Sequence, residues 1–298
     1  MSFSVVTLLP TPDAAEDQVA TARAVLAAAA MPVTATHVRD GAVDLVFAGD
    51  RGAARAALEA ACADGQGLSG CDILVQPWPR TLPRLFVADM DSTMITVECI
   101  DELADYAGVK AEVAAVTERA MRGELDFAAA LAARVALLAG LDEAVLARCH
   151  DERVRLMPGA RALVATLAAR GVRCVLVSGG FTHFAARVAR EIGFHAAFAN
   201  TLELADGRLT GRVVPPVLGA EAKRERLLAE AAALGITPAQ AVAVGDGAND
   251  IPMLQQAGLG FAYRAKPVAH AAADAGVRHG DLTAILHALG IPRADWVA

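Results

Sequence analysis

The chain has 298 residues, enough for one large domain plus a small one or for two of ordinary size. A formal net charge of −7, no basic run and only two Trp and two Tyr argue against a nucleic-acid-binding surface. No apolar run approaches the roughly 18 residues that cross a bilayer, and the amino terminus lacks signal-peptide features, so we expect a cytoplasmic protein without membrane contact.

The first 80 residues predict a small α+β unit. Alternating or apolar runs indicate strands at 3–8, 32–38, 43–48 and 71–76, with helical patterns at about 13–30 and 51–63. The resulting βαββαβ order is that of a ferredoxin-like unit. Three prolines in the segment that follows, Pro77, Pro79 and Pro83, predict a stiff connector.

From residue 84 onward the pattern is typical of an α/β domain. The runs 85–88, 172–177 and 241–244 are apolar throughout, as expected for parallel strands that are buried on both faces. Helical segments between them predict a parallel sheet with helices on both sides. Residues 98 to about 153 contain no strand-like run and only amphipathic helix, which indicates a helical insertion between the first two strands.

Two aspartates, Asp89 and Asp91, follow the first of these strands in LFVADMDST. Residues i and i+2 of an extended chain project to one side about 6.5 to 7 Å apart, so both can face one ligand. When two carboxylates lie so near each other, their pKa values move apart, so that one is ionised and the other can hold a proton. This suits Asp89 as a nucleophile and Asp91 as a general acid. The alternative is a solvated loop or a helix N-cap, with DSTM supplying the capping groups.

The second strand ends in SGGF. Ser178, Gly179 and the next glycine can direct successive N–H groups at an anion, which would hold phosphate oxygens. A serine N-cap after a glycine-rich turn is the alternative.

The third strand ends in GDGAND, which places Asp246 at the strand edge and Asp250 near a helix start. Asp89 and Asp246, with a backbone carbonyl, would be sufficient protein ligands for Mg²⁺, which prefers hard oxygen donors and keeps several waters. Asp250 could instead be a helix cap. Lys223, one of only three lysines, precedes this strand and could neutralise a transferring phosphoryl group, or be an exposed helix lysine.

Taken in order, DMDST, SGGF, the isolated lysine and GDGAND resemble the four motifs of the haloacid dehalogenase (HAD) superfamily of aspartyl-phosphate enzymes. The resemblance covers residues 84 to about 290. It implies a HAD-like Rossmannoid domain over 84–298 with a helical cap at about 96–157, and Mg²⁺ as cofactor. It also implies that the backbone carbonyl of Asp91 is a metal ligand and that Asn249 binds phosphate or orients water.

Within that superfamily the chain most resembles the phosphoserine phosphatases, because DMDST continues into MITVECIDELADYAG and the insertion carries ERAMRGELDFAAALAARVALLAGL. The resemblance implies Mg²⁺-dependent hydrolysis of L-phosphoserine, the last step of serine biosynthesis. Glu98 would meet the substrate's amino group and Arg134 its carboxylate, with Met121 and Phe127 lining the closed pocket. From spacing alone, Glu98 would instead be read as a first-turn helix acid and Arg134 as a solvated helix charge.

Two alternatives remain open at this stage. The HAD chemistry could serve another small phosphate ester, or pass the phosphoryl group to an alcohol such as homoserine. Residues 1–80 resemble ACT-like domains by strand order, so the chain could instead be a serine-responsive regulatory protein. For this unit we expect regulation, dimerisation into a homodimer, or simple packing.

Overall fold

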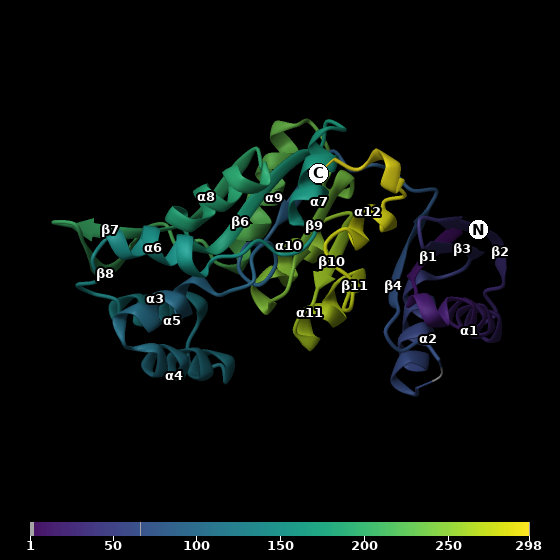
Figure 1. The fold of residues 1–298 in the computed structure, drawn as a ribbon, viewed down its shortest axis with the longest axis horizontal. Coiled ribbons are helices and arrows are strands. Elements are labelled where there is room, and N and C mark those ends of the chain that lie inside the picture. Colours follow the sequence, from purple (N-terminus) through teal and green to yellow (C-terminus); the bar gives the residue numbers. More distant parts are fainter. Residues whose placement is uncertain (1–2, 66, 298) are drawn as a thin grey trace.

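The computed structural model describes residues 3–65 and 67–297, and their strands form one mixed sheet of eleven. The strand order is β2-β3-β1-β4-β11-β10-β9-β5-β6-β7-β8. Figure 1 shows the amino-terminal unit at one end of the long axis and the β7–β8 hairpin at the other. Among the described helices, none combines the length and apolar character that a membrane crossing requires.

The amino-terminal unit has the predicted βαββαβ order. Its elements are β1 (Phe3–Leu9), α1 (Ala15–Ala28), β2 (Val33–Arg39), β3 (Ala42–Ala48), α2 (Arg51–Ala63) and β4 (Asp72–Trp78). The two helices cover one sheet face and bury a core that includes Leu8, Leu26, Phe47 and Leu58. The predicted connector starts too early, because β4 continues through Pro77, which lies opposite Ser4 of β1.

In the α/β part, β7 (Ala196–Ala205) lies parallel to β6 at one side of the parallel strands. Five further strands run parallel to it. They are β5 (Leu85–Ala88), β6 (Arg173–Phe181), β9 (Ala241–Gly245), β10 (Leu259–Tyr263) and β11 (Ala275–Val277). Its helices are α7 (Ala160–Ala168), α8 (Thr182–Ile192), α9 (Ala220–Ala233), α10 (Ile251–Gln256), α11 (Pro267–Ala272) and α12 (Ala284–Ala288). In β5, Phe86 and Ala88 enter one hydrophobic core while Leu85 and Val87 enter another. Both faces are therefore covered, as the unbroken apolar run predicts.

The insertion after β5 is helical, as predicted. It consists of α3 (Cys99–Ala107), α4 (Lys110–Met121), α5 (Phe127–Ala136) and α6 (Ala144–Arg153). One feature that the sequence analysis does not predict is an antiparallel hairpin, β7 (Ala196–Ala205) and β8 (Arg208–Val214), which extends the sheet toward this insertion. Leu209 of β8 exchanges backbone hydrogen bonds with Gly140 and Leu141. The hairpin therefore supports the insertion from the sheet side.

The amino-terminal unit and the α/β part are joined edge to edge. Strand β4 lies antiparallel to β11, with Ile73 opposite Gly276. The buried carboxylate of Asp72 accepts hydrogen bonds from the N–H groups of residues 278, 279 and 280, at 2.7, 3.0 and 2.7 Å. Two side chains of the amino-terminal unit and its connector, Gln76 and Arg80, donate to the carbonyl of Ala288 at the end of α12. The sequence predicts two units but gives no sign of this shared sheet.

Candidate active site

Three neighbouring parallel strands place acidic and hydroxyl side chains at one edge of the sheet. Asp89 directly follows β5, Ser178 lies near the end of β6, and Asp246 directly follows β9. Strand β5 lies between the other two, so the three side chains meet at the carboxyl ends of the strands. All three residues are buried. The structure thus brings together the residues that the three strand-end motifs single out.

Lys223, on the first turn of α9, lies completely buried between two carboxylates. Its ammonium is 2.5 Å from Asp89 Oδ1 and 2.6 Å from Asp250 Oδ1. Burial alone would lower the pKa of Lys223, but Asp250 and Asp89 raise it above its ordinary value. The lysine is therefore charged at neutral pH and is not an exposed helix residue.

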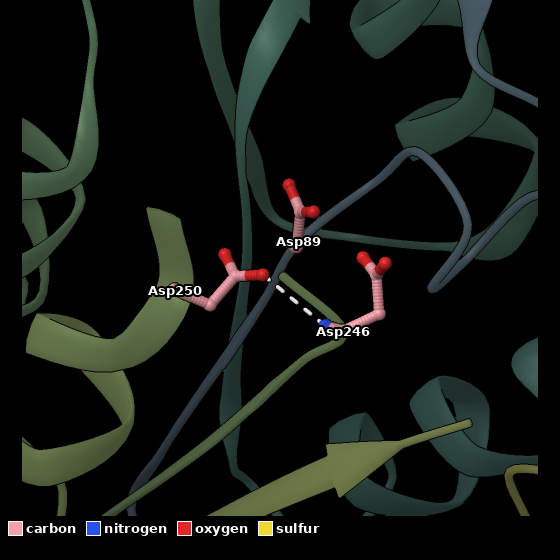
Figure 2. Close-up of side chains that lie close together, drawn as sticks. All are labelled: Asp89, Asp246 and Asp250. Carbon is pink, nitrogen blue, oxygen red and sulfur yellow. Dashed lines mark hydrogen bonds between the residues drawn. The ribbon is translucent and has the colours of Figure 1, made fainter. Parts of the chain in front are cut away.

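The acidic side chains form a hard-oxygen group that suits a divalent cation. Asp89, Asp246 and Asp250 can each offer an oxygen so that all three lie within 4.8 Å of one another (Figure 2). Asp250 Oδ2 also accepts the backbone N–H groups of Asp246, at 3.1 Å, and Gly247, at 3.0 Å. Both oxygens of Asp250 thus have protein partners, whereas Asp89 and Asp246 keep capacity for a metal ion. Burial, together with Asp250, raises the pKa of Asp246 to about 6.

The second carboxylate of the pair, Asp91, sits among donors and is also buried. Its Oδ1 accepts the backbone N–H of Cys99 at 3.0 Å, and its Oδ2 accepts the hydroxyl of Ser178 at 3.2 Å. Burial raises the pKa of Asp91, although these hydrogen bonds oppose the rise. Gly180 is required beside it, because a Cβ at that position would come within 2.5 Å of Asp91 Oδ2.

The residues that the family resemblance assigns to substrate lie in or near the helical insertion. Glu98 is exposed at the start of α3, and its Oε1 accepts the hydroxyl of Ser92 at 2.7 Å. Arg134 of α5 is half-buried, and burial lowers its pKa, while Asp101 and Glu98 oppose that change.

The remaining assigned residues differ in where the structure places them. The ring of Phe127 rests near Gly179, where an added Cβ would come within 3.1 Å of Cζ. Such a Cβ would also lie 3.9 Å from the amide nitrogen of Asn249, so Asn249 borders the same loop. Met121, at the end of α4, is 75% exposed and lines no closed pocket in this structure.

Two buried polar residues near the site are missing from the sequence analysis. Thr93 donates its hydroxyl to Asp246 Oδ1 at 3.3 Å and is fully buried. Asn200 of β7 is 1% exposed and bonds to backbone atoms of Gly179 and Leu218. Thr93 is part of the DMDST motif, so its position in the sequence could have indicated that it lies at the site. Asn200 lies in the unpredicted hairpin, so nothing in the sequence connected it to the site.

Comparison with known families identifies the class of this fold and site. The family model of haloacid dehalogenase-like hydrolases matches residues 86–255. That range holds all three strand-end motifs and Lys223. The chain therefore belongs to the haloacid dehalogenase-like hydrolase family.

Individual relatives narrow the group further. The phosphoserine phosphatase of Albidiferax ferrireducens is 47% identical over 208 residues, covering 68% of this chain and 88% of the relative. An unliganded structure named as a probable phosphoserine phosphatase of Vibrio cholerae is 34% identical, with a TM-score of 0.75 over 98% of this chain and 88% of its own. A phospho-aspartyl intermediate analogue of phosphoserine phosphatase is 40% identical, with a TM-score of 0.65, over 70% of this chain and 99% of that one. Within the family, the chain groups with the phosphoserine phosphatases.

Proposed function

We propose that this chain hydrolyses L-phosphoserine to serine and phosphate through an aspartyl phosphate on Asp89. The observation that supports it most is the buried Lys223 held 2.5 Å from Asp89 at the edge where Asp91 and Ser178 also converge. The choice of substrate is supported by the relatives that are named as phosphoserine phosphatases. The choice of intermediate is supported by the similar structure named as a phospho-aspartyl intermediate analogue. In this proposal the chain acts in the last step of serine biosynthesis, in the cytoplasm.

The reaction divides into two displacements at phosphorus. Uncatalysed hydrolysis of a phosphate monoester is extremely slow, so a covalent intermediate replaces one difficult step with two easier ones. Burial and Asp250 raise the pKa of Asp89, and the Lys223 ammonium opposes that rise. As the carboxylate, Asp89 attacks phosphorus in line with the leaving serine oxygen. Lys223, Ser178 and the N–H groups of its loop hold the equatorial oxygens and offset their charge.

Asp91 moves the proton in both half-reactions. Its raised pKa lets it hold a proton at Oδ2, beside Ser178, and give it to the departing serine oxygen. The same carboxylate then takes a proton from the water that attacks the aspartyl phosphate. Asn249, which borders the loop at Gly179, binds phosphate or orients that water.

The acidic group fits Mg²⁺ as its cation. Asp89 and Asp246 side chains with the backbone carbonyl of Asp91 would hold it, and Asp250 would support them through its hydrogen bonds to residues 246 and 247. When bound, the ion neutralises phosphate charge that three nearby carboxylates would otherwise repel.

Residues of the helical insertion, and Glu98 at its start, recognise the amino-acid part of the substrate. Glu98 meets the ammonium group of the substrate, and the planar guanidinium of Arg134 pairs with its carboxylate. Phe127, and Met121 once the insertion closes, exclude water while the phosphoryl group is transferred.

Phosphate release from L-phosphoserine tests this function directly. It is compared with a panel of phosphate esters, with and without homoserine as acceptor, in Mg²⁺ and then in excess chelator. We expect L-phosphoserine to have the highest kcat/KM, chelator to abolish turnover, and added Mg²⁺ to raise the melting temperature. Better turnover of another ester, or transfer to homoserine, would favour the alternative within the same family.

For residues 1–80 we propose a packing role in place of serine sensing. The sheet face opposite α1 and α2 carries Thr7, Asp44 and Gln76, and the end of α12 covers it. L-serine should then bind at one site per chain in a calorimetric titration, and a second site would instead support a regulatory role. The homodimer stays a prediction, which light scattering on the purified chain would test.

A further inference from the structure

Asn200 lies in the middle of β7, opposite Phe181 at the end of β6, and makes three hydrogen bonds to backbone atoms. Its amide nitrogen donates to the carbonyls of Gly179, at 2.9 Å, and Leu218, at 3.1 Å. Its amide oxygen accepts the N–H of Leu218 at 2.7 Å. The opposite amide orientation would set an oxygen against two carbonyls, so this arrangement is fixed.

One of the two bridged segments orients the phosphate loop. In a trans peptide the C=O and the following N–H point in opposite directions. Because the Gly179 carbonyl turns toward Asn200, the N–H of Gly180 turns away from it and donates to Ser178 Oγ at 2.8 Å. That hydroxyl in turn donates to Asp91. The orientation of Ser178 therefore depends on where Asn200 holds the next peptide.

The other bridged segment begins the helix that carries the lysine. Leu218 precedes Gly219, whose carbonyl accepts the N–H of Lys223 in the first turn of α9. Phe127 also rests on both segments, since a Cβ on Gly179 or Gly219 would come within 3.1 or 3.0 Å of its ring. Asn200 thus ties together the serine loop, the start of the lysine helix and the surface that meets the insertion.

We propose that Asn200 is a positioning residue for phosphoryl transfer, an inference that rests on the proposed function. It fixes the spacing between Ser178 and Lys223, which belong to different elements about 45 residues apart in sequence. Misplacement of groups by about 1 Å can reduce turnover by about 100-fold. Loss of this bridge should therefore reduce kcat more than it changes KM.

The test replaces the amide with its isosteric acid, in Asn200→Asp. A matched control is Gln18→Glu, because the Gln18 amide is equally buried and bridges two loops of the amino-terminal unit, accepting from Thr11 N–H and donating to Ser69 O. We expect similar losses in melting temperature for both variants. Only Asn200→Asp should lose about 100-fold in kcat, with KM within about threefold of wild type.

Both variants are assayed with L-phosphoserine and with p-nitrophenyl phosphate. The aryl ester lacks the amino-acid groups, so its hydrolysis does not depend on L-phosphoserine being the substrate. The kcat values of Asn200→Asp and wild type can therefore be compared even if wild type does not hydrolyse L-phosphoserine and the proposed substrate is wrong. The ratio of variant to wild-type kcat should rise as pH falls, because a protonated carboxyl can donate to one of the two carbonyls. If Asn200→Asp does not fold, Asn200→Ser should show the same selective loss of kcat. Turnover within threefold of wild type, or a loss no larger than that of Gln18→Glu, would overturn the proposal.

Discussion

Replacing Arg80 with methionine should weaken the joint between the amino-terminal unit and the α/β part. The Arg80 side chain is 10% exposed and donates to both oxygens of Asp44, to Thr7 Oγ1 and to the carbonyl of Ala288. Asp44 is 1% exposed and would keep only Arg39 as a charged partner. Removing one partner of a buried ion pair costs about 3–5 kcal/mol. We expect the lower end, about 3 kcal/mol, because Arg39 remains.

Urea denaturation of the full chain measures this loss. Of the two tryptophans, Trp78 lies at the joint, where Arg80 covers its ring at 5.2 Å. Trp296 packs at 5.0 Å on His287 of α12, the helix that contacts β1 of the amino-terminal unit. Fluorescence therefore reports the joint, whereas circular dichroism reports all helices. In Arg80→Met we expect the fluorescence transition to come at lower urea than the circular dichroism transition.

An exposed ion pair provides the matched control. Arg212 is 71% exposed and pairs with Glu203 on the hairpin, so Arg212→Met should change the free energy of unfolding by less than about 1 kcal/mol. A loss for Arg80→Met as small as that of Arg212→Met, with coincident transitions, would refute the reasoning.

Three further outcomes follow from the site and the joint. Asp89→Asn should abolish turnover at saturating Mg²⁺ while leaving the circular dichroism spectrum unchanged, because an amide cannot attack phosphorus; appreciable activity would rule out the nucleophile assignment. Arg134→Ala should lower kcat/KM for L-phosphoserine far more than for an ester without a carboxylate, and equal losses would make the arginine structural. A hydrogen bond with His270 lowers the pKa of Glu59 from 4.5 to about 2, so its stabilisation is complete above pH 4.5 and is lost as pH falls toward 2. Glu59→Gln should therefore be less stable than wild type at pH 7, by under about 1 kcal/mol because the pair is partly exposed, and urea midpoints should converge near pH 2.

Strand positions were predicted for three apolar runs of the α/β part, but not for β10, although all five of its residues are buried. The runs 85–88 and 241–244 match β5 and β9 closely, and their following aspartates meet because parallel strands end at one edge. The hairpin β7–β8 was missed although its turn contains Asp206-Gly207, both with positive φ, the pattern typical of a tight hairpin. Its strands mix polar and apolar residues, so they carry little periodic signal. Strand β11 has only three residues, too few for any pattern.

Contacts between distant segments could not be predicted from local patterns. Lys223 was singled out because lysine is rare in this chain, but only the fold places it between Asp89 and Asp250. Arg80 was part of an expected connector, yet it bonds to residues 36 and 208 positions away. The hydrogen-bond partners of Asn200 are backbone atoms, which every residue type has, so the sequence does not indicate them.

The edge-to-edge joint also constrains how a ribosome-bound chain can fold. Strand β4 is complete by residue 78, whereas the N–H groups that Asp72 accepts lie 206 to 208 residues later. At about 5–20 residues per second, that interval lasts roughly 10–40 s of translation. During this time the open side of β4 is available to other nascent strands. The charge of Asp72 at one end of β4 and the missing N–H of Pro77 near the other end make this edge a poor template for such pairing. The Asp72 carboxylate therefore disfavours wrong strand pairing before β11 is synthesised, and stabilises the joint afterwards.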